Sequence, residues 1–288
     1  MGELIWPLGL TQEHLLAIKK LEETCCRVES LSMKLNWDML NTRPVNQRND
    51  LLCYDRNQLI GYLGLYAMSE AAKEVEITGM VHPDYRRKGL FTNLYTSALK
   101  ECENRGVEKI LLIAEKASDT GMGFAKSTGA EYTCSEYRMR NEMAVVPDFK
   151  SSDITLRKAL SADYPDLIKL DAAAFHDDEA VAEDAAINAY RTTLVAELDG
   201  VFIGKIGLLL EEGDGYIFGF VIKPEYRGRG YGREVLSRAL LRFQSEQVKR
   251  VCLEVAVKNE NALMLYKNCG FEEITVYNYF SKDLNKRE

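Results

Sequence analysis

The feature that most restricts the fold of this chain is a long internal repeat. Residues 81–94 read VHPDYRRKGLFTNL, and residues 222–235 read IKPEYRGRGYGREV. Four residue types recur at a constant separation of 141 residues, as Pro83 and Pro224, Tyr85 and Tyr226, Arg86 and Arg227, and Gly89 and Gly230. A period of this length indicates duplication of a whole domain, because stacked solenoid repeats have periods of only about 20–50 residues.

The repeat continues on both sides of this stretch. Downstream, the same separation relates Ile110 to Val251, Gly129 to Gly270, and Glu131 to Glu272. Upstream, LIGYLGL and FIGKIGL are 143 residues apart, so one hairpin differs in length between the copies. The 288 residues suit two domains of about 150 residues each. We therefore expect domains at residues 1–145 and 151–288, joined by a linker around 142–153.

Each half has the pattern of a mixed α/β layer structure. In the second half, apolar strand patterns cover residues 153–159, 215–222, 250–257 and 271–280, and a hairpin is predicted around Asp199-Gly200. Helix patterns begin near Ser161 and Gly230 and cover residues 259–269, where Gly270 ends the helix. A further short helix is expected around 181–190.

The cysteines and histidines indicate neither a disulfide framework nor a metal site. The seven cysteines are an odd number without a C-x-x-C pair, and the three histidines are scattered. We expect reduced thiols, a cytoplasmic protein and no metal. No apolar run approaches the ~20 residues that span a bilayer, and the N-terminal residues do not form a signal peptide, so no membrane contact is expected.

The glycine-rich and arginine-rich run from Arg227 to Arg233 lies where a strand ends and a helix begins. The first backbone N–H groups of a helix lack intrahelical partners, and glycines let a ligand approach them closely. This arrangement suits a pyrophosphate. The spacing fits neither the Rossmann pattern nor the Walker A loop, because residue 233 is arginine and no G-K-[ST] is present.

Two other interpretations of this run are a solvated basic turn and a nucleic-acid contact. The repetition of the strand, loop and helix in the first half argues against the solvated turn. Nucleic-acid binders are usually basic, whereas this chain carries a net charge of −7. Residues 151–288 contain 18 Lys and Arg against 23 Asp and Glu, a net of −5, so we expect no nucleic-acid partner.

The pattern Arg227-x-x-Gly230-x-Gly232 resembles the acetyl-coenzyme A signature of the GNAT N-acetyltransferase superfamily. The resemblance implies two tandem GNAT-like domains with α/β mixed sheets, and acetyl-CoA as the acyl donor. The loop would hold the pyrophosphate, and the strand before it would lie along the pantetheine arm. The cofactor-binding residues so implied are Phe220, Val221, Ile222, Arg227, Gly228, Arg229, Gly230, Tyr231, Gly232 and Arg233.

The second half also resembles RimI-type N-terminal acetyltransferases. The matching residues are Leu253-Glu254-Val255, Asn259, Ala262, Leu265-Tyr266 and Gly270-Phe271. By this resemblance Glu254 is the general base, Tyr266 the general acid and Asn259 a cofactor contact. The chemistry agrees, because amine attack requires a neutral nucleophile and the departing thiolate gains from a proton donor. The alternatives are a core tyrosine, a solvated glutamate and an asparagine that only caps the next helix.

The first half lacks these three residues. The 141-residue offset places Ile113, Ser118 and Ala125 at the positions of Glu254, Asn259 and Tyr266. It also places Arg87 and Phe91 at the positions of Gly228 and Gly232. Glu115 shares the strand face of Ile113, and Arg86-x-x-Gly89 is kept, so some coenzyme A binding by Arg86 and Gly89 is expected. We predict that catalysis lies in the second half, as in other tandem members of the family.

The acceptor is expected to be a small-molecule or peptide amine. The acidic segment FHDDEAVAED, residues 175–184, would attract a cationic amine or simply form a solvated face. A different class of function, a non-catalytic acyl-CoA sensor or assembly module, would suit the first half alone. Release of coenzyme A at steady state separates an enzyme from such a sensor.

Overall fold

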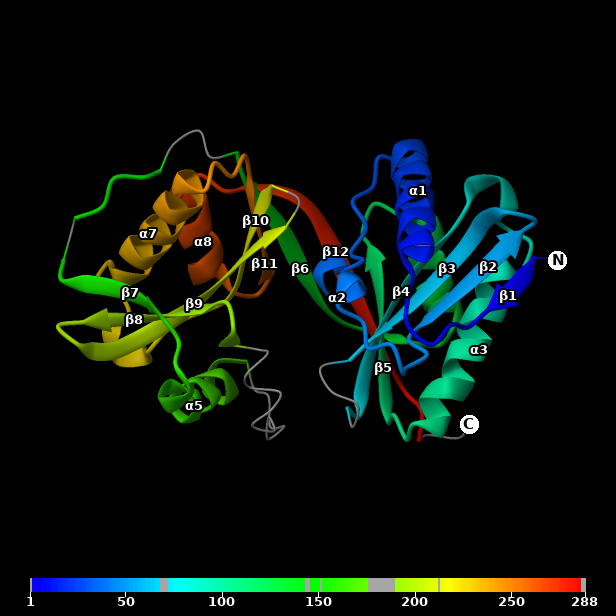
Figure 1. Ribbon diagram of the computed structural model, residues 1–288, viewed down its shortest axis with the longest axis horizontal. Coiled ribbons are helices and arrows are strands. Elements are labelled where there is room, and N and C mark those ends of the chain that lie inside the picture. Colours follow the sequence, from blue (N-terminus) through cyan, green and yellow to red (C-terminus); the bar gives the residue numbers. More distant parts are fainter. Residues whose placement is uncertain are drawn as a thin grey trace. The chain divides into compact units, whose positions relative to one another are not determined.

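The structure is a computed structural model and describes residues 2–67, 72–142, 146–150, 152–175, 190–211 and 213–285. The chain forms two compact units. Unit 1 comprises Met1–Ser135 and Thr275–Glu288, and unit 2 comprises Glu136–Ile274. Each unit is a mixed β-sheet with helices on both faces, which confirms the expected fold class (Figure 1). The helix expected around 181–190 and most of the acidic segment 175–184 lie outside the described residues.

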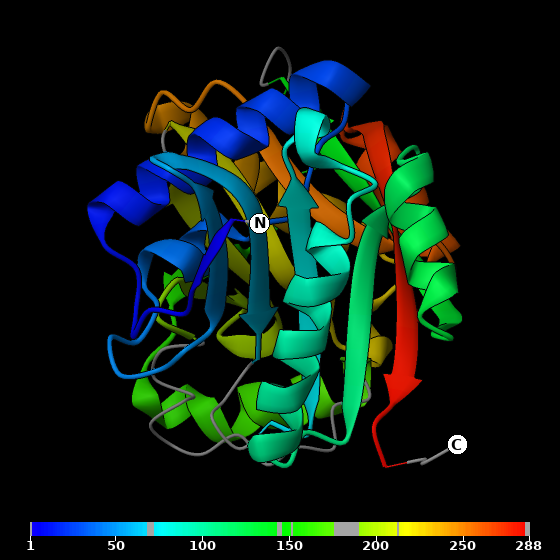
Figure 2. The ribbon, with the colours of Figure 1, turned by 90° about the vertical axis from the view of Figure 1, so that its right-hand side faces the viewer.

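Unit 1 has the sheet order β1-β2-β3-β4-β5-β12, in which only β4 and β5 are parallel. Its elements are β1 (Glu3–Ile5), α1 (Gln12–Glu29), α2 (Trp37–Asn41), β2 (Asp50–Asp55), β3 (Gln58–Tyr66), β4 (Glu74–Val81), the 3-10 helix η1 (Pro83–Tyr85), α3 (Leu90–Asn104), β5 (Lys109–Glu115), α4 (Asp119–Ser127) and most of β12 (Glu272–Asp283). Side chains alternate between the two faces of a strand, so Leu51 joins the core against α3 and Leu52 the core against α1. Figure 2 shows α3 lying along the strands of this unit.

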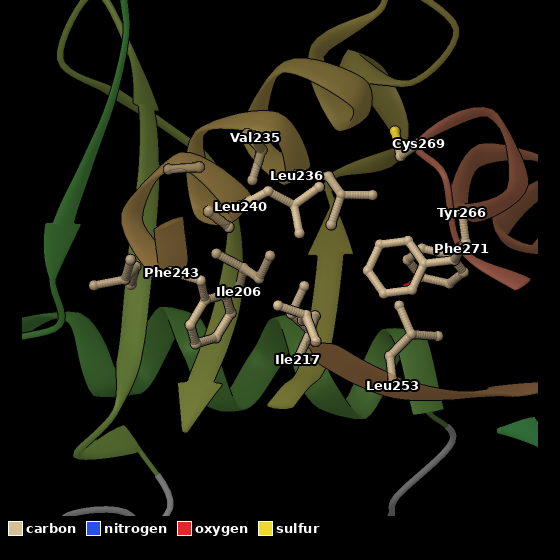
Figure 3. Close-up of a cluster of buried hydrophobic side chains, with 14 of the residues drawn as sticks. Ile206, Ile217, Val235, Leu236, Leu240, Phe243, Leu253, Tyr266, Cys269 and Phe271 are labelled. Atoms are coloured by element: carbon tan, nitrogen blue, oxygen red, sulfur yellow. The ribbon is translucent and has the colours of Figure 1, made fainter. Parts of the chain in front are cut away.

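Unit 2 has the sheet order β6-β11-β10-β9-β8-β7, in which only β10 and β11 are parallel. Its elements are most of β6 (Glu131–Asn141), β7 (Ile154–Lys158), η2 (Ser161–Asp163), α5 (Tyr164–Phe175), β8 (Thr193–Leu198), β9 (Val201–Glu211), β10 (Asp214–Ile222), η3 (Pro224–Tyr226), α7 (Tyr231–Ser245), β11 (Val251–Ala256) and α8 (Glu260–Asn268). Figure 3 shows Val235, Leu236 and Phe243 of α7 packed onto Ile206 and Ile217 of the strands. The helix α5 covers the other face of the sheet.

The elements of the two units follow the predicted repeat. Helices α3 and α7 begin 141 residues apart, at Leu90 and Tyr231, and α4 and α8 begin at the same separation. The hairpin predicted at Asp199-Gly200 is confirmed, with φ values of 51° and 77° that suit a two-residue turn between β8 and β9. The spacing of the glycines and prolines therefore located the elements correctly.

The last strand of each sequence repeat pairs with a strand of the other repeat. Strand β6 ends the first repeat, yet it pairs with β11 from Asn141 opposite Val251 to Glu136 opposite Ala256. Strand β12 ends the second repeat, yet it pairs with β5 from Tyr277 opposite Glu115 to Asp283 opposite Lys109 (Figure 1). The boundaries 1–145 and 151–288 stay a prediction for the duplicated repeats, whereas the compact units divide the chain near residues 135 and 275.

The described part of the chain contains neither a candidate membrane span nor a candidate metal cluster. No helix there has the length and apolar character of a membrane-spanning segment. No group of three or more His, Cys, Asp or Glu side chains among those residues is arranged to hold a metal ion.

Candidate functional site

In unit 2, the strands β10 and β11 part before the glycine-rich loop. Their parallel pairing runs from Gly215 opposite Val251 to Ile217 opposite Leu253 and ends there. On the other edge of β10, the register against β9 shifts between Phe218 and Val221, with Gly219 at a φ of 53°. A bulge bends its strand and interrupts the ladder. The backbone of residues 218–222 therefore lacks ladder partners on the β11 side.

The loop that follows has a backbone that requires glycine. Gly228 and Gly230 have φ values of 73° and 87°, and a Cβ at either position would meet no atom within 4 Å. Gly230 is the N-cap of α7 and makes no side-chain capping bond, so the first N–H groups of this helix lack intrahelical partners. Arg227 Nε donates a hydrogen bond to the Ile222 carbonyl at 2.8 Å, which fixes the arginine beside the end of β10. The predicted cradle residues from Arg227 to Arg233 thus lie together at one helix N-terminus.

Gly232 has a different environment. A Cβ at this position would lie 3.4 Å from Leu265 Cδ2, 3.8 Å from Ile222 Cγ1 and 4.0 Å from Phe220 Cζ. Gly232 therefore faces the space between the end of β10 and helix α8. A larger side chain at position 232 would occupy this space.

Tyr266 lies on α8 and is 7% exposed. Its ring centroid is 6.5 Å from that of Phe220 and 5.9 Å from that of Phe271 (Figure 3). Burial, with a smaller contribution from Cys269, raises the pKa of Tyr266 to about 12. Its hydroxyl therefore stays protonated, as a proton donor must. The alternative prediction of a core tyrosine agrees equally with this packing.

Glu254 lies on the opposite face of β11 from Tyr266. Leu253 and Val255 point into the core that contains Tyr266, so the strand alternation directs Glu254 to the other face. Glu254 is exposed and stands opposite Arg138 of β6 in the antiparallel ladder. The structure therefore places these two residues on opposite sides of one strand.

Asn259 is the N-cap of α8. Its Oδ1 accepts a hydrogen bond from the Ala262 backbone N–H at 3.2 Å. Ser118 does the same for α4 in unit 1, where Ser118 Oγ accepts from the Gly121 N–H at 3.2 Å. The helix-capping interpretation is thus confirmed, and contact of the Asn259 side chain with a cofactor stays a prediction.

Unit 1 has a corresponding site with a cavity of about 590 Å³. The pairing of β4 and β5 ends at Ile77 opposite Leu112, but β3 and β4 pair without a register shift, so this unit lacks the bulge of unit 2. Arg86 Nε donates to the Val81 carbonyl at 3.0 Å, as Arg227 does to Ile222. Arg86 and Gly89 both line the cavity, and their contact with a cofactor stays a prediction.

One buried polar cluster in unit 2 was not predicted from the sequence. Lys205 of β9 is 5% exposed, and its Nζ lies 2.5 Å from the Asp171 carboxylate of α5. The Tyr190 hydroxyl donates to Asp171 Oδ2 at 2.8 Å. Burial lowers the pKa of Lys205, and Asp171 partly opposes this shift. The sequence feature that could have revealed this cluster is a single lysine inside the apolar strand VFIGKIGLLL.

This cluster lies beside the bulge. Lys205 stands opposite Val221 in the ladder, and its Nζ is 3.4 Å from the position that a Cβ on Gly219 would take. Loss of one partner from a buried ion pair leaves an uncompensated charge. We therefore expect the Lys205–Asp171 pair to hold β9 in place where β10 begins to bulge.

The family model of the acetyltransferase (GNAT) family matches the chain twice, at residues 16–130 and 155–271. A ribosomal protein bS18 alanine N-acetyltransferase of Haemophilus influenzae is 33% identical over 73 residues, which are 25% of this chain and 49% of that protein. A spermidine N(1)-acetyltransferase of Vibrio cholerae is 35% identical over 92 residues, which are 30% of this chain and 51% of that protein. The chain thus spans about half the length of these curated relatives.

Two comparisons extend over most of the chain. A mycothiol acetyltransferase of Thermobispora bispora is 25% identical over 248 residues, which cover 78% of this chain and 81% of that protein. The crystal structure of a tandem GNAT protein from the clavulanic acid biosynthesis pathway superimposes with a TM-score of 0.74 at 15% identity, covering all of both chains. The second comparison shows that the fold of two tandem domains is shared.

Proposed function

Because the chain belongs to the acetyltransferase (GNAT) family, we propose that it transfers an acetyl group from acetyl-CoA to a primary amine, and that unit 2 performs the reaction. The observation that carries this proposal is the order of three features along β10. The strand parts from β11, it bulges at Gly219, and it ends in a loop whose glycines leave a helix N-terminus open. Unit 1 keeps only part of this arrangement.

In this proposal the loop holds the diphosphate of acetyl-CoA. Helix N-terminal N–H groups and the helix dipole favour an anion, and Arg227, Arg229 and Arg233 add full positive charges. The unpaired backbone of residues 218–222 suits the extended, amide-containing arm of the donor. The donor-binding residues are Phe220, Val221, Ile222, Arg227, Gly228, Arg229, Gly230, Tyr231, Gly232, Arg233 and Asn259.

In the proposed direct transfer, Glu254 and Tyr266 act on different atoms of the reacting groups. Glu254 takes a proton from the amine, the amine nitrogen bonds to the acetyl carbon, and the carbon–sulfur bond breaks. Tyr266 gives its proton to the departing thiolate, which a raised pKa permits throughout the neutral range. A backbone N–H of the bulged strand stabilises the negative charge that forms on the carbonyl oxygen. No covalent enzyme intermediate is required.

The acceptor in this proposal is a small-molecule or peptide amine. The two curated relatives act, by their names, on a ribosomal protein alanine and on spermidine, so relatives of similar identity use both kinds of amine. All seven cysteines are free, which supports the cytoplasm as the place of action.

The test is coenzyme A release from acetyl-CoA with a panel of peptides, polyamines and aminoglycosides. We expect release with at least one amine, and a fall in kcat of about 100-fold or more for Glu254→Gln and Tyr266→Phe, the usual contribution of general acid–base groups. The matched controls are Glu272→Gln on β12 and Tyr132→Phe on β6, two exposed positions that should keep full activity.

Binding of acetyl-CoA without release for any amine would instead identify a sensor. Full activity of Tyr266→Phe together with full activity of Glu254→Gln would contradict the assigned roles.

A further inference from the structure

One aromatic side chain of unit 2 is exposed beside the proposed general base. Phe218 lies on β10 and is 41% exposed. The pairing of β10 with β11 ends at Ile217 opposite Leu253. Both of these side chains point into the core that α7 covers (Figure 3), so strand alternation turns the next residues, Phe218 and Glu254, to the α5 face. The ring and the carboxylate therefore share one face of the sheet, at the point where the two strands part.

The ring of Phe218 rests on a glycine of the neighbouring strand. Gly207 of β9 stands opposite Phe218 in the ladder. A Cβ on Gly207 would lie only 2.6 Å from Phe218 Cζ and 2.7 Å from Phe218 Cδ2, far inside van der Waals contact. Glycine at position 207 therefore provides the space in which the ring lies.

Unit 1 fills the corresponding space with buried side chains. Gly64 of β3 is the counterpart of Gly207, and it stands opposite Thr78, which is buried. A Cβ on Gly64 would meet the hydroxyl of Tyr62 and the ring of Tyr66, and both tyrosines belong to the core against α1. An exposed aromatic ring at this position is thus a property of unit 2, the unit that we propose to be catalytic.

The charged groups on both sides of the ring favour a ligand with one positive charge. Glu254 is the carboxylate beside the ring, and Arg138 of β6 stands opposite Glu254 in the ladder. On the β9 side of the ring, the Lys205 ammonium is already bound to the Asp171 carboxylate. A second ammonium group on the ligand would lie near Arg138 or Lys205, and like charges in contact weaken binding.

An exposed ring next to a carboxylate suits an amine that is attached to an apolar group. The carboxylate attracts the ammonium ion, and the face of an aromatic ring attracts it as well. An apolar group next to the amine removes the surface of the ring from water, which strengthens binding in proportion to the area that is buried. An amine without such a group would leave this surface exposed.

From these contacts we infer that Phe218 is a specificity-determining residue, and that the acceptor is an amine with a single positive charge and an adjacent apolar group, as at the N-terminus of a peptide with an apolar first residue. The role of Phe218 rests on the proposed function, since Glu254 is taken there as the group that receives the proton of the amine. It narrows the acceptor to one class of amine and disfavours polyamines.

The first experiment measures coenzyme A release from acetyl-CoA with three probes, which are leucinamide, glycinamide and spermidine. We expect kcat/KM for leucinamide to exceed that for each of the other two by at least about tenfold, because even one methylene group in an apolar site changes this ratio by about 10–200-fold. Phe218→Ala should remove most of the preference for leucinamide over glycinamide, and Phe218→Leu should keep part of it. An unchanged preference in Phe218→Ala, or faster turnover of glycinamide or spermidine, would overturn the inference.

The second experiment moves the ring without removing it. The Cβ that Gly207→Ala adds overlaps the outer end of the Phe218 ring, which can swing away while β9 stays in the sheet. The preference for leucinamide should fall by at least about threefold in this variant, the effect of a direct contact between two residues. In the Phe218→Ala background, Gly207→Ala should have no further effect on the preference.

Leu210→Ala is the matched control for this cycle. Leu210 is an exposed apolar residue of the same strand, opposite Gly215, and the change should leave the preference unchanged. Equal effects of Gly207→Ala with and without the Phe218 ring would contradict the contact between the two residues.

Hydrogen exchange of the full chain with the unacetylated probes separates this inference from the proposed function. Leucinamide should protect the backbone amides of residues 214–222 and 251–256 more than glycinamide does, and Phe218→Ala should abolish the difference. Protection that depends on Phe218 without coenzyme A release from any probe would support the inference and contradict the proposed function. Release at equal rates from leucinamide and glycinamide would support the proposed function and overturn the inference.

Discussion

The loops at residues 86–89 and 227–230 have similar backbone conformations but differ in the side chains around them. Each begins with an arginine bonded to the last strand carbonyl and ends in a left-handed glycine that caps a helix. In unit 2 Arg227 makes no ion pair with a described residue, and a Cβ on Gly232 would be in van der Waals contact with Leu265. In unit 1 Arg86 is ion-paired with Glu29, and Phe91 stands at the position of Gly232 and lines the cavity. The two copies of the loop thus differ in the side chains around them, at positions 29 and 91 of unit 1.

The largest expected effect comes from placing phenylalanine, the residue at position 91 of unit 1, at the corresponding position 232 of unit 2. Gly232→Phe should lower kcat/KM for acetyl-CoA by more than about 100-fold, because the ring would fill the space between Leu265 and Phe220 that the donor needs. Steady-state kinetics and the melting temperature check this. A folded variant with unchanged kinetics would show that this space is not the donor route.

The next largest effect is on stability, at corresponding positions on β9 and β3. Lys205→Met leaves the partly buried Asp171 without its cation and should cost about 3 kcal/mol in the free energy of unfolding, the lower end for a buried ion pair. At the corresponding position of unit 1, Tyr62→Phe removes one hydrogen bond to Asp50, which keeps Arg43, and should cost only about 1–2 kcal/mol.

Urea unfolding of both variants tests this difference between loss of a cation and loss of one hydrogen bond to a carboxylate that keeps its arginine. The double variant Asp171→Leu with Lys205→Met should recover part of the loss. Equal costs for Lys205→Met and Tyr62→Phe would contradict a charged pair in unit 2.

A pH profile tests the protonation of Tyr266. Its pKa is raised to about 12 by burial, so its proton-donating form persists at every pH well below that value. The alkaline limb of kcat should therefore not show the ordinary tyrosine pKa of about 10. A limb with an apparent pKa near 10 that is absent from Tyr266→Phe would contradict the buried environment.

The smallest expected effect concerns Glu234, whose counterpart in unit 1 is Asn93. Burial raises the pKa of Glu234, but hydrogen bonds from Ser152 and Arg238 outweigh this and leave it lowered. A lowered folded pKa stabilises the protein above the unfolded value of about 4.3, and this contribution is lost as the pH falls through the folded pKa.

Glu234→Gln should therefore cost about 1–2 kcal/mol at pH 7 and much less at low pH. Asn93→Gln, the matched change in unit 1, should show no such pH dependence. Chemical unfolding at a series of pH values checks both. A Glu234→Gln cost that is constant between pH 7 and pH 3 would contradict the assignment.

The sequence predicted the elements well and the long-range contacts poorly. Glycine spacing and strand periodicity are local signals, so the loop at Arg227–Gly230 and the hairpin at Asp199-Gly200 were found. The ion pair of Glu29 with Arg86 joins residues 57 positions apart, and nothing local in α1 marks it. The exchange of β6 and β12 was missed because the two strands are copies of one repeat, and either copy has the alternation to complete either sheet.

The exchange of the last strands sets an order for folding during synthesis. Unit 1 is nearly all made first, but its sheet lacks β12 until residues 275–283 have been synthesised. Until then β5 presents an unpaired edge, which is a template for pairing with other chains. A nascent or truncated chain that ends near residue 145 therefore either leaves that edge open or pairs it with β6, the copy of β12 that such a chain contains.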